Sequence, residues 1–140
     1  MKAFTARNFQ VSFLMGKGPV MAKRILIVDD DPQLLEELKC SLMDDYEVFT
    51  LQDSKEVLDT AVRLRPDVVL LDVGMPGESG LQAACKIMYF SDLNDIEIIV
   101  MSGKYRERYE ALTQICGFKG FLPKPFCYEE LRCKLGKVGG

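Results

Sequence analysis

Short aliphatic runs alternate with segments of helical spacing from Met21 to the end of the chain. Ile25–Val28, Val68–Leu71 and Ile96–Met101 are continuous apolar runs of strand length, which is typical of parallel strands buried on both faces. Glu47–Leu51 and Gly120–Leu122 are shorter and weaker runs of the same kind. This alternation predicts an α/β fold, a doubly wound five-stranded parallel sheet with helices on both faces.

The segments between these runs carry helix signals. Asp31 and Pro32 supply an N-cap and a first-turn proline. Asp53 and Glu56 have the spacing of a capping box, and Gly117 has the position of a helix stop. We expect five helices, and the apolar faces or ranges that define them are Leu34, Leu35, Leu38 and Leu42; Val57, Leu58, Ala61 and Leu64; Leu81, Ala84, Ile87 and Met88; Tyr105, Tyr109, Leu112 and Cys116; and Phe126–Leu135.

Polar residues follow four of the five predicted strands. Asp29 and Asp30 come after the first strand, and Asp72 comes after the third. Ser102 and Lys124 follow the fourth and fifth strands. Because ligands of doubly wound sheets bind outside the carboxyl ends of the strands, we expect these five side chains to form one pocket.

The carboxylates of this pocket need a cation. Asp31 is explained as a helix cap, but Asp29 and Asp30 would repel each other and Asp72 at the end of a buried strand. A divalent metal such as Mg²⁺ removes that repulsion and can hold a phosphoryl group beside a lysine. Taken singly, Lys124 is typical of a solvated surface lysine and Ser102 of a helix cap. Their expected position in the same pocket as the carboxylates favours a role in binding the metal or the phosphoryl group.

Composition restricts the function classes. The net charge of −3 and the pI near 5.1, without a basic cluster, argue against direct nucleic-acid binding. No run approaches the ~20 apolar residues of a membrane span. The five cysteines form no Cys-x-x-Cys pair, which favours reduced thiols over a metal or redox site and a cytoplasmic location.

The two ends of the chain differ from its body. Residues 1–20 hold three basic residues and no acid, and their apolar part is too short for a signal peptide. We therefore expect an N-terminal extension over 1–20, flexible, artefactual or partner-binding, then one domain over 21–137 and a tail over 138–140.

Four motifs resemble the receiver domain of bacterial two-component response regulators, of the chemotaxis-receiver kind. They are Ile25–Pro32, Asp67–Gly80 with its Asp-Val-Gly-Met-Pro core, Met101–Gly103 and Phe121–Phe126. The resemblance covers residues 24–135, and it implies a flavodoxin-like sheet of order 2-1-3-4-5.

The resemblance also implies residue roles. Asp72 matches the phosphoacceptor, and Asp29, Asp30, Asp72 and the backbone carbonyl of Gly74 match the ligands of Mg²⁺ or Mn²⁺. Lys124 and Ser102 match the residues that contact the phosphoryl group, and Gly103 matches a small position that gives access to the site. Phe121 stands at the aromatic switch position, which works together with Ser102, and Gly74 and Lys104 stand where the family tunes hydrolysis.

The implied function is a phosphoacceptor that switches a partner-binding face. The chain has no histidine, so a phosphohistidine donor must belong to a histidine kinase or a histidine phosphotransfer protein. Its downstream partner is an unidentified protein, and it is a signalling domain that catalyses only its own phosphorylation and dephosphorylation.

Three alternatives stay open from the residues. A binding module could keep the receiver fold without using phosphate. A haloacid-dehalogenase-like phosphatase could use Asp29, Asp31, Ser102 and Lys124, although it would leave Asp72 idle. A flavodoxin is disfavoured, because three aspartates after the first strand would repel a flavin phosphate.

Overall fold

The computed structural model describes residues 23–74, 80–90, 93, 95–104 and 106–136. The side chain of Arg106 is also left out of the description. The N-terminal extension, residues 75–79 of the Asp67–Gly80 motif, Tyr105 and the tail over 138–140 therefore lie outside the described residues.

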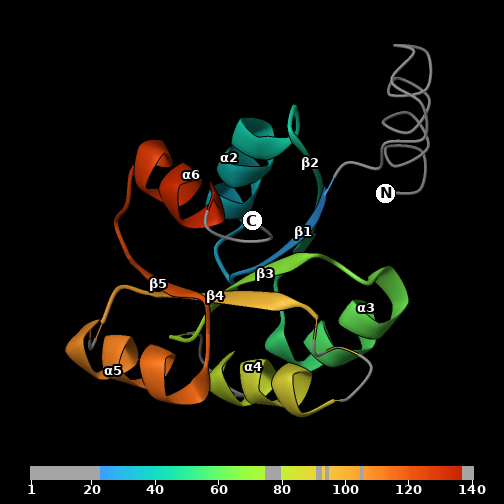
Figure 1. Cartoon of the computed structure of the whole chain (residues 1–140). Helices are drawn as coiled ribbons and strands as arrows, with labels where there is room; N and C mark the ends of the chain where they lie inside the picture. The colour runs from blue at the N-terminus through green and yellow to red at the C-terminus, as the bar shows by residue number, and fades with distance from the viewer. Residues whose placement is uncertain (1–22, 75–79, 91–92, 94, 105, 137–140) are drawn as a thin grey trace.

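Five parallel strands form one sheet in the order β2-β1-β3-β4-β5 (Figure 1). The strands are β1 (Lys23–Val28), β2 (Tyr46–Leu51), β3 (Val68–Asp72), β4 (Glu97–Ser102) and β5 (Gly120–Pro123). Parallel pairing places Ile25 beside Val48 on one side and beside Val68 on the other. The predicted fold class and strand order are confirmed.

Helices cover both faces of the sheet. Helices α2 (Pro32–Leu42) and α6 (Tyr128–Gly136) lie on one face, and α3 (Val57–Leu64), α4 (Gly80–Tyr89) and α5 (Arg106–Cys116) lie on the other (Figure 1). No helix in the described part of the chain has both the length and the apolar character that crossing a membrane requires.

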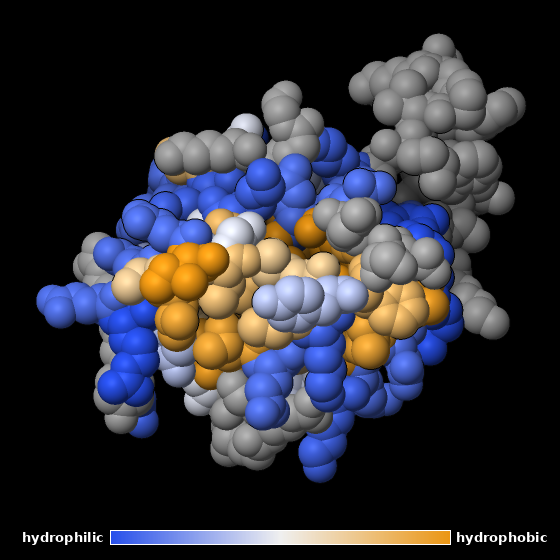
Figure 2. All heavy atoms as spheres, turned by 60° about the horizontal axis from the view of Figure 1, so that its bottom comes forward, coloured by the Kyte–Doolittle hydropathy of each residue, from blue (hydrophilic) through white to orange (hydrophobic). Residues whose placement is uncertain are grey.

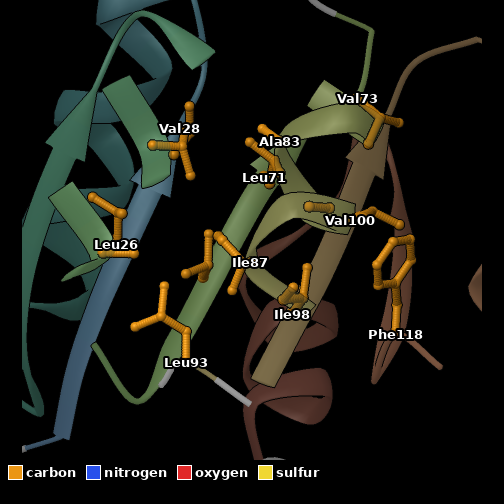
Figure 3. Close-up of a cluster of buried hydrophobic side chains, with 14 of the residues drawn as sticks. Leu26, Val28, Leu71, Val73, Ala83, Ile87, Leu93, Ile98, Val100 and Phe118 are labelled. Atoms are coloured by element: carbon orange, nitrogen blue, oxygen red, sulfur yellow. The ribbon is translucent and has the colours of Figure 1, made fainter. Parts of the chain in front are cut away.

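The core consists of two layers, one on each face of the sheet. Alternate residues of β1 divide between them, because successive strand side chains point to opposite faces. Leu26 and Val28 belong to the layer under α3, α4 and α5, which Figure 3 shows, whereas Ile25 and Ile27 belong to the layer under α2 and α6. All four residues are completely buried, as the aliphatic run predicted.

Three helix ends differ in detail from the sequence expectation. The Asp53 side chain accepts from the Lys55 amide and caps a short 3-10 helix, η1 (Ser54–Glu56), before α3 begins. Helix α3 ends at Leu64, and Arg65 follows it in the left-handed conformation with φ 52°, a helix end that the sequence does not signal with a glycine. Helix α6 begins at Tyr128 rather than at Phe126, because the Glu130 carboxylate accepts from the Cys127 amide and makes Cys127 the cap.

Candidate phosphoacceptor and metal site

The carboxyl ends of four strands bring the predicted residues to one edge of the sheet. Asp72 and Ser102 are the last residues of β3 and β4. Asp29 follows β1 directly, and Lys124 follows β5 directly. The register pairs Asp72 with Met101, so Asp72 and Ser102 end on neighbouring strands at nearly the same level.

Lys124 joins two of these strands through its ammonium group. Its Nζ donates to Asp29 Oδ2 at 2.5 Å and to Asp72 Oδ2 at 3.0 Å. Asp29 is completely buried and Asp72 is 5% exposed, so the ammonium compensates two carboxylates that water does not reach freely. Lys124 therefore lies in the acidic pocket and not on the open surface.

Three carboxylates meet in the pocket. Asp29, Asp30 and Asp72 each offer one carboxylate oxygen, and these oxygens lie within 4.8 Å of one another. Asp30 is exposed, so the cluster opens to solvent on its side. Oxygen ligands that converge from one side and leave room for water suit Mg²⁺, which keeps several waters when it binds to proteins.

Backbone amides fix the two buried carboxylates. The Asp31 amide donates to Asp29 Oδ1 at 2.9 Å, and the Gly74 amide donates to Asp72 Oδ1 at 2.7 Å. Each carboxylate thus has one oxygen held by the backbone and the other held by Lys124. The family resemblance implies only a carbonyl ligand at Gly74, and the contact of its amide with Asp72 is an additional feature of the structure.

Ser102 is turned toward its own loop. Its hydroxyl donates to the Lys104 carbonyl at 2.8 Å and accepts from the Lys104 amide at 3.1 Å. The hydroxyl still lies near the pocket, since a Cβ built on Gly74 would be 3.3 Å from Asp72 Oδ1 and 3.5 Å from Ser102 Oγ. A Cβ built on Gly103 would meet Lys124 Cβ at 3.7 Å, so Gly103 borders the pocket.

Burial and charge shift the protonation equilibria of the pocket. Burial raises the pKa of Asp72, and it outweighs the hydrogen bonds from Gly74 and Lys124, which lower that pKa. For Lys124, burial lowers the pKa, but the hydrogen bonds to Asp29 and Asp72 outweigh it and the pKa is raised. Both pKa values are raised, which favours a charged Lys124 and a protonated Asp72, and the single ammonium is shared between two carboxylates. The excess of negative charge favours a further cation.

Phe121 is part of the buried core. It is 5% exposed and belongs to the core layer under α3, α4 and α5. The side chain is therefore covered by the packing of this layer and not by solvent.

Gly80 is the residue of this region that sequence reasoning missed. A Cβ built on it would lie 2.2 Å from the Asp72 carbonyl oxygen and 2.8 Å from Val73 Cα. Only glycine allows the start of α4 to pack directly against the main chain of Asp72. Gly80 ends the Asp67–Gly80 motif, but a glycine in a sequence motif does not reveal which backbone it touches.

Known proteins resemble this chain over most of its length. Residues 25–135 match the response regulator receiver domain family. Response regulator MprA of Mycolicibacterium vanbaalenii is 39% identical over 118 residues, which are 82% of this chain and 49% of that protein. MprA of Mycobacterium tuberculosis (strain ATCC 25177 / H37Ra) is 37% identical over the same share of this chain and 50% of its own length. The chain thus spans about half the length of these relatives.

Solved structures show the same fold. The chemotaxis protein CheY4 of Vibrio cholerae has a TM-score of 0.77 and 30% identity, over 85% of this chain and 99% of that one. The response regulator TrrA of Thermotoga maritima, in complex with Mg²⁺-BeF, has a TM-score of 0.71 and 34% identity over 82% and 97% of the two chains. The motifs at the strand ends, the strand order and these likenesses agree, and the chain belongs to the family of response regulator receiver domains.

Proposed function

We propose that this chain receives a phosphoryl group on Asp72 in a two-component signalling pathway. The observation that carries the proposal is the position of Lys124 Nζ between the buried carboxylates of Asp29 and Asp72, beside the exposed carboxylate of Asp30. Receiver domains are signalling domains and not metabolic enzymes, and they bind Mg²⁺ at an acidic pocket of this kind. TrrA, with Mg²⁺-BeF in its structure, supports the same reading.

Asp29, Asp30 and Asp72, with the Gly74 carbonyl, are the groups that would hold the metal. When bound, Mg²⁺ would neutralise the carboxylates and the charge of the incoming phosphoryl group. Mn²⁺ suits the same oxygen ligands.

The chain's own residues position the reaction. A carboxylate oxygen of Asp72 attacks phosphorus in line, and the P–N bond of the donor phosphohistidine breaks as the new P–O bond forms. The leaving imidazole takes up a proton. Lys124, which already contacts Asp72 Oδ2, exchanges that contact for a phosphoryl oxygen and keeps the ammonium beside the developing charge.

The donor is a phosphohistidine of a histidine kinase or of a histidine phosphotransfer protein, because this chain contains no histidine. Ser102 then leaves Lys104 and bonds to the phosphoryl group, and Phe121 reports the change on the output face. We propose that the domain spans residues 21–137. We also propose that it works in the cytoplasm. The haloacid-dehalogenase-like alternative does not fit the family match or the central position of Asp72.

Phosphorylation by a small-molecule donor tests the proposal. Acetyl phosphate or phosphoramidate with Mg²⁺ should add one phosphoryl group to the chain, as measured by intact mass. Asp72→Asn should add none. The matched control is Asp31→Asn, because asparagine caps a helix as well as aspartate and the side chain of Asp31 holds only the start of α2.

The outcome separates the proposal from its alternative. Quantitative phosphorylation of Asp72→Asn would refute the assignment of the phosphoacceptor. A parent chain that accepts no phosphoryl group, while it binds Mg²⁺ and stays folded, would favour the binding module that keeps the fold without using phosphate.

A further inference from the structure

Two of the five cysteines meet between neighbouring helices. Cys85 lies in α4 and Cys116 is the last residue of α5, and the two thiols lie close enough for Cys116 to raise the pKa of Cys85. Both residues are half-buried and pack against the same core layer. They are 31 positions apart in the chain, so their meeting is a result of the fold.

A second contact supports the close approach of the two helix ends. Met88 lies one turn after Cys85, and a Cβ built on Gly117 would be 3.3 Å from Met88 Cε. Gly117 has φ +81°, so the chain turns directly after Cys116 and keeps that residue at the end of α5. The residues that follow the two cysteines therefore lie against each other.

The other three cysteines have different surroundings. Cys40, Cys127 and Cys133 are exposed. Cys40 and Cys127 donate to Glu36 and Glu130, which are near them in sequence. The five thiols thus comprise one facing pair and three surface residues.

Small molecules can reach the pair from the surface. Figure 2 brings the side of α4 and α5 forward and shows hydrophobic residues gathered across this face. Tyr89 of α4 and Ile115 of α5 are exposed large apolar residues next to this end of the helices. Because the thiols are only half-buried, a hydroperoxide can reach them.

We propose that Cys85 and Cys116 are a reversible disulfide site that ties α5 to α4. A hydroperoxide takes two electrons from the pair. The thiolate of one cysteine attacks the peroxide oxygen, forms a sulfenic acid and releases water or an alcohol; the other sulfur then attacks the sulfenic sulfur, forms the S–S bond and releases water. A thiol reductant restores both thiols.

The order of attack follows from the surroundings of Cys85. Burial, and then the neighbouring Cys116, raise the pKa of the Cys85 thiol, so Cys85 keeps its proton more firmly. Attack on the peroxide therefore begins at Cys116. The bridge requires the two side chains to rotate until the sulfurs reach the bond length of about 2.05 Å.

The disulfide would join α5, which follows the turn that Ser102 must leave, to α4, which starts against the backbone of Asp72. Helix α4 starts at Gly80, which packs on the backbone of Asp72. Helix α5 follows the Ser102–Lys104 turn, and Ser102 must release both of its bonds to Lys104 before it can reach a phosphoryl group. A bond at the far end of α5 opposes any movement that this release starts. This part of the inference rests on the proposed function.

The test uses the full chain with the three exposed cysteines replaced by serine. After oxidation with hydrogen peroxide and alkylation, the intact chain should remain a monomer. Non-reducing peptide mapping should then show a peptide pair linked through Cys85 and Cys116, and dithiothreitol should remove this linkage. Cys85→Ser in the same background should form no internal disulfide. A pair that stays reduced, or that reaches sulfinic acid without a bridge, would overturn the proposal.

The coupling is measured as a redox equilibrium in glutathione buffers. Beryllofluoride with Mg²⁺ should make the pair about fivefold harder to oxidise, and oxidation should weaken beryllofluoride binding by the same factor, since coupling is reciprocal. An unchanged equilibrium with tight beryllofluoride binding would refute the tether. Failure of the reduced chain to bind beryllofluoride would instead refute the proposed function, whereas the linked peptide would still establish the disulfide.

Discussion

Replacement of Gly80 by alanine should destabilise the chain by about 1–3 kcal/mol, the usual cost of overpacking. The new Cβ would lie 2.2 Å from the Asp72 carbonyl oxygen, far inside the 3.0 Å below which Cβ atoms essentially never approach another heavy atom. The other near atoms are Val73 Cα and the Asp72 carbonyl carbon, at 2.8 and 3.0 Å. All three are backbone atoms, so no rotamer change can relieve the clash.

The sign of this effect opposes helix propensity. Alanine is better than glycine inside a helix by up to about 1 kcal/mol, so a position with free space would gain stability. Gly136 is the matched control, because it ends α6 and a Cβ there would meet nothing within 4 Å. We expect Gly136→Ala to be neutral or slightly stabilising.

Urea denaturation followed by circular dichroism measures both variants. The Gly80→Ala midpoint should fall while the slope stays that of the parent, and Gly136→Ala should keep or raise the midpoint. Because the start of α4 must move away from Asp72, Gly80→Ala should also accept the phosphoryl group more slowly. A Gly80→Ala chain as stable as the parent would refute the close packing of α4 on the phosphoacceptor strand.

Three further outcomes follow from the pocket. Mg²⁺ at ten times its dissociation constant should stabilise the fold by about 1.4 kcal/mol, and Asp30→Asn should remove most of this gain in thermal melts. Burial raises the pKa of Asp72, so the folded chain holds this proton more firmly than the unfolded chain, and the resulting stability is lost as the pH rises through the folded pKa. Without metal, the melting temperature of Asp72→Asn minus that of the parent should therefore increase as the pH rises from acid to neutral. A difference that does not change with pH would contradict the raised pKa of Asp72. Beryllofluoride with Mg²⁺ should move the amide resonances of residues 102–108 and 118–126 more than those of 32–43, and equal changes would argue against an output face at α5, β5 and α6.

The strands and the pocket could be predicted because they depend on simple periodicities. Ile25–Val28 is apolar at every position, and only a strand covered on both faces buries such a run. Once parallel strands are assigned, their carboxyl ends must share one edge, which brings Asp29, Asp72 and Lys124 together without knowledge of the strand order. The order itself came from the family resemblance.

Contacts between segments could not be predicted in this way. The approach of Gly80 to Asp72, the thiol pair of Cys85 and Cys116, and the two bonds between Ser102 and Lys104 depend on how loops and helices settle on the sheet. The expected core face of α5 is also less buried than its spacing predicted, since Tyr109 and Leu112 are only half-buried. Helix period indicates which residues share a face but not how deeply that face is covered.

The location of the phosphoryl group tests the central proposal most directly. Borohydride reduces an acyl phosphate to an alcohol, which converts a phosphorylated aspartate to homoserine. The chain should be phosphorylated with acetyl phosphate and Mg²⁺, reduced, digested and sequenced by fragment mass spectrometry. We predict homoserine at Asp72 and unchanged aspartate at Asp29 and Asp30. Homoserine at either of those residues, or at none in a phosphorylated chain, would contradict the proposal.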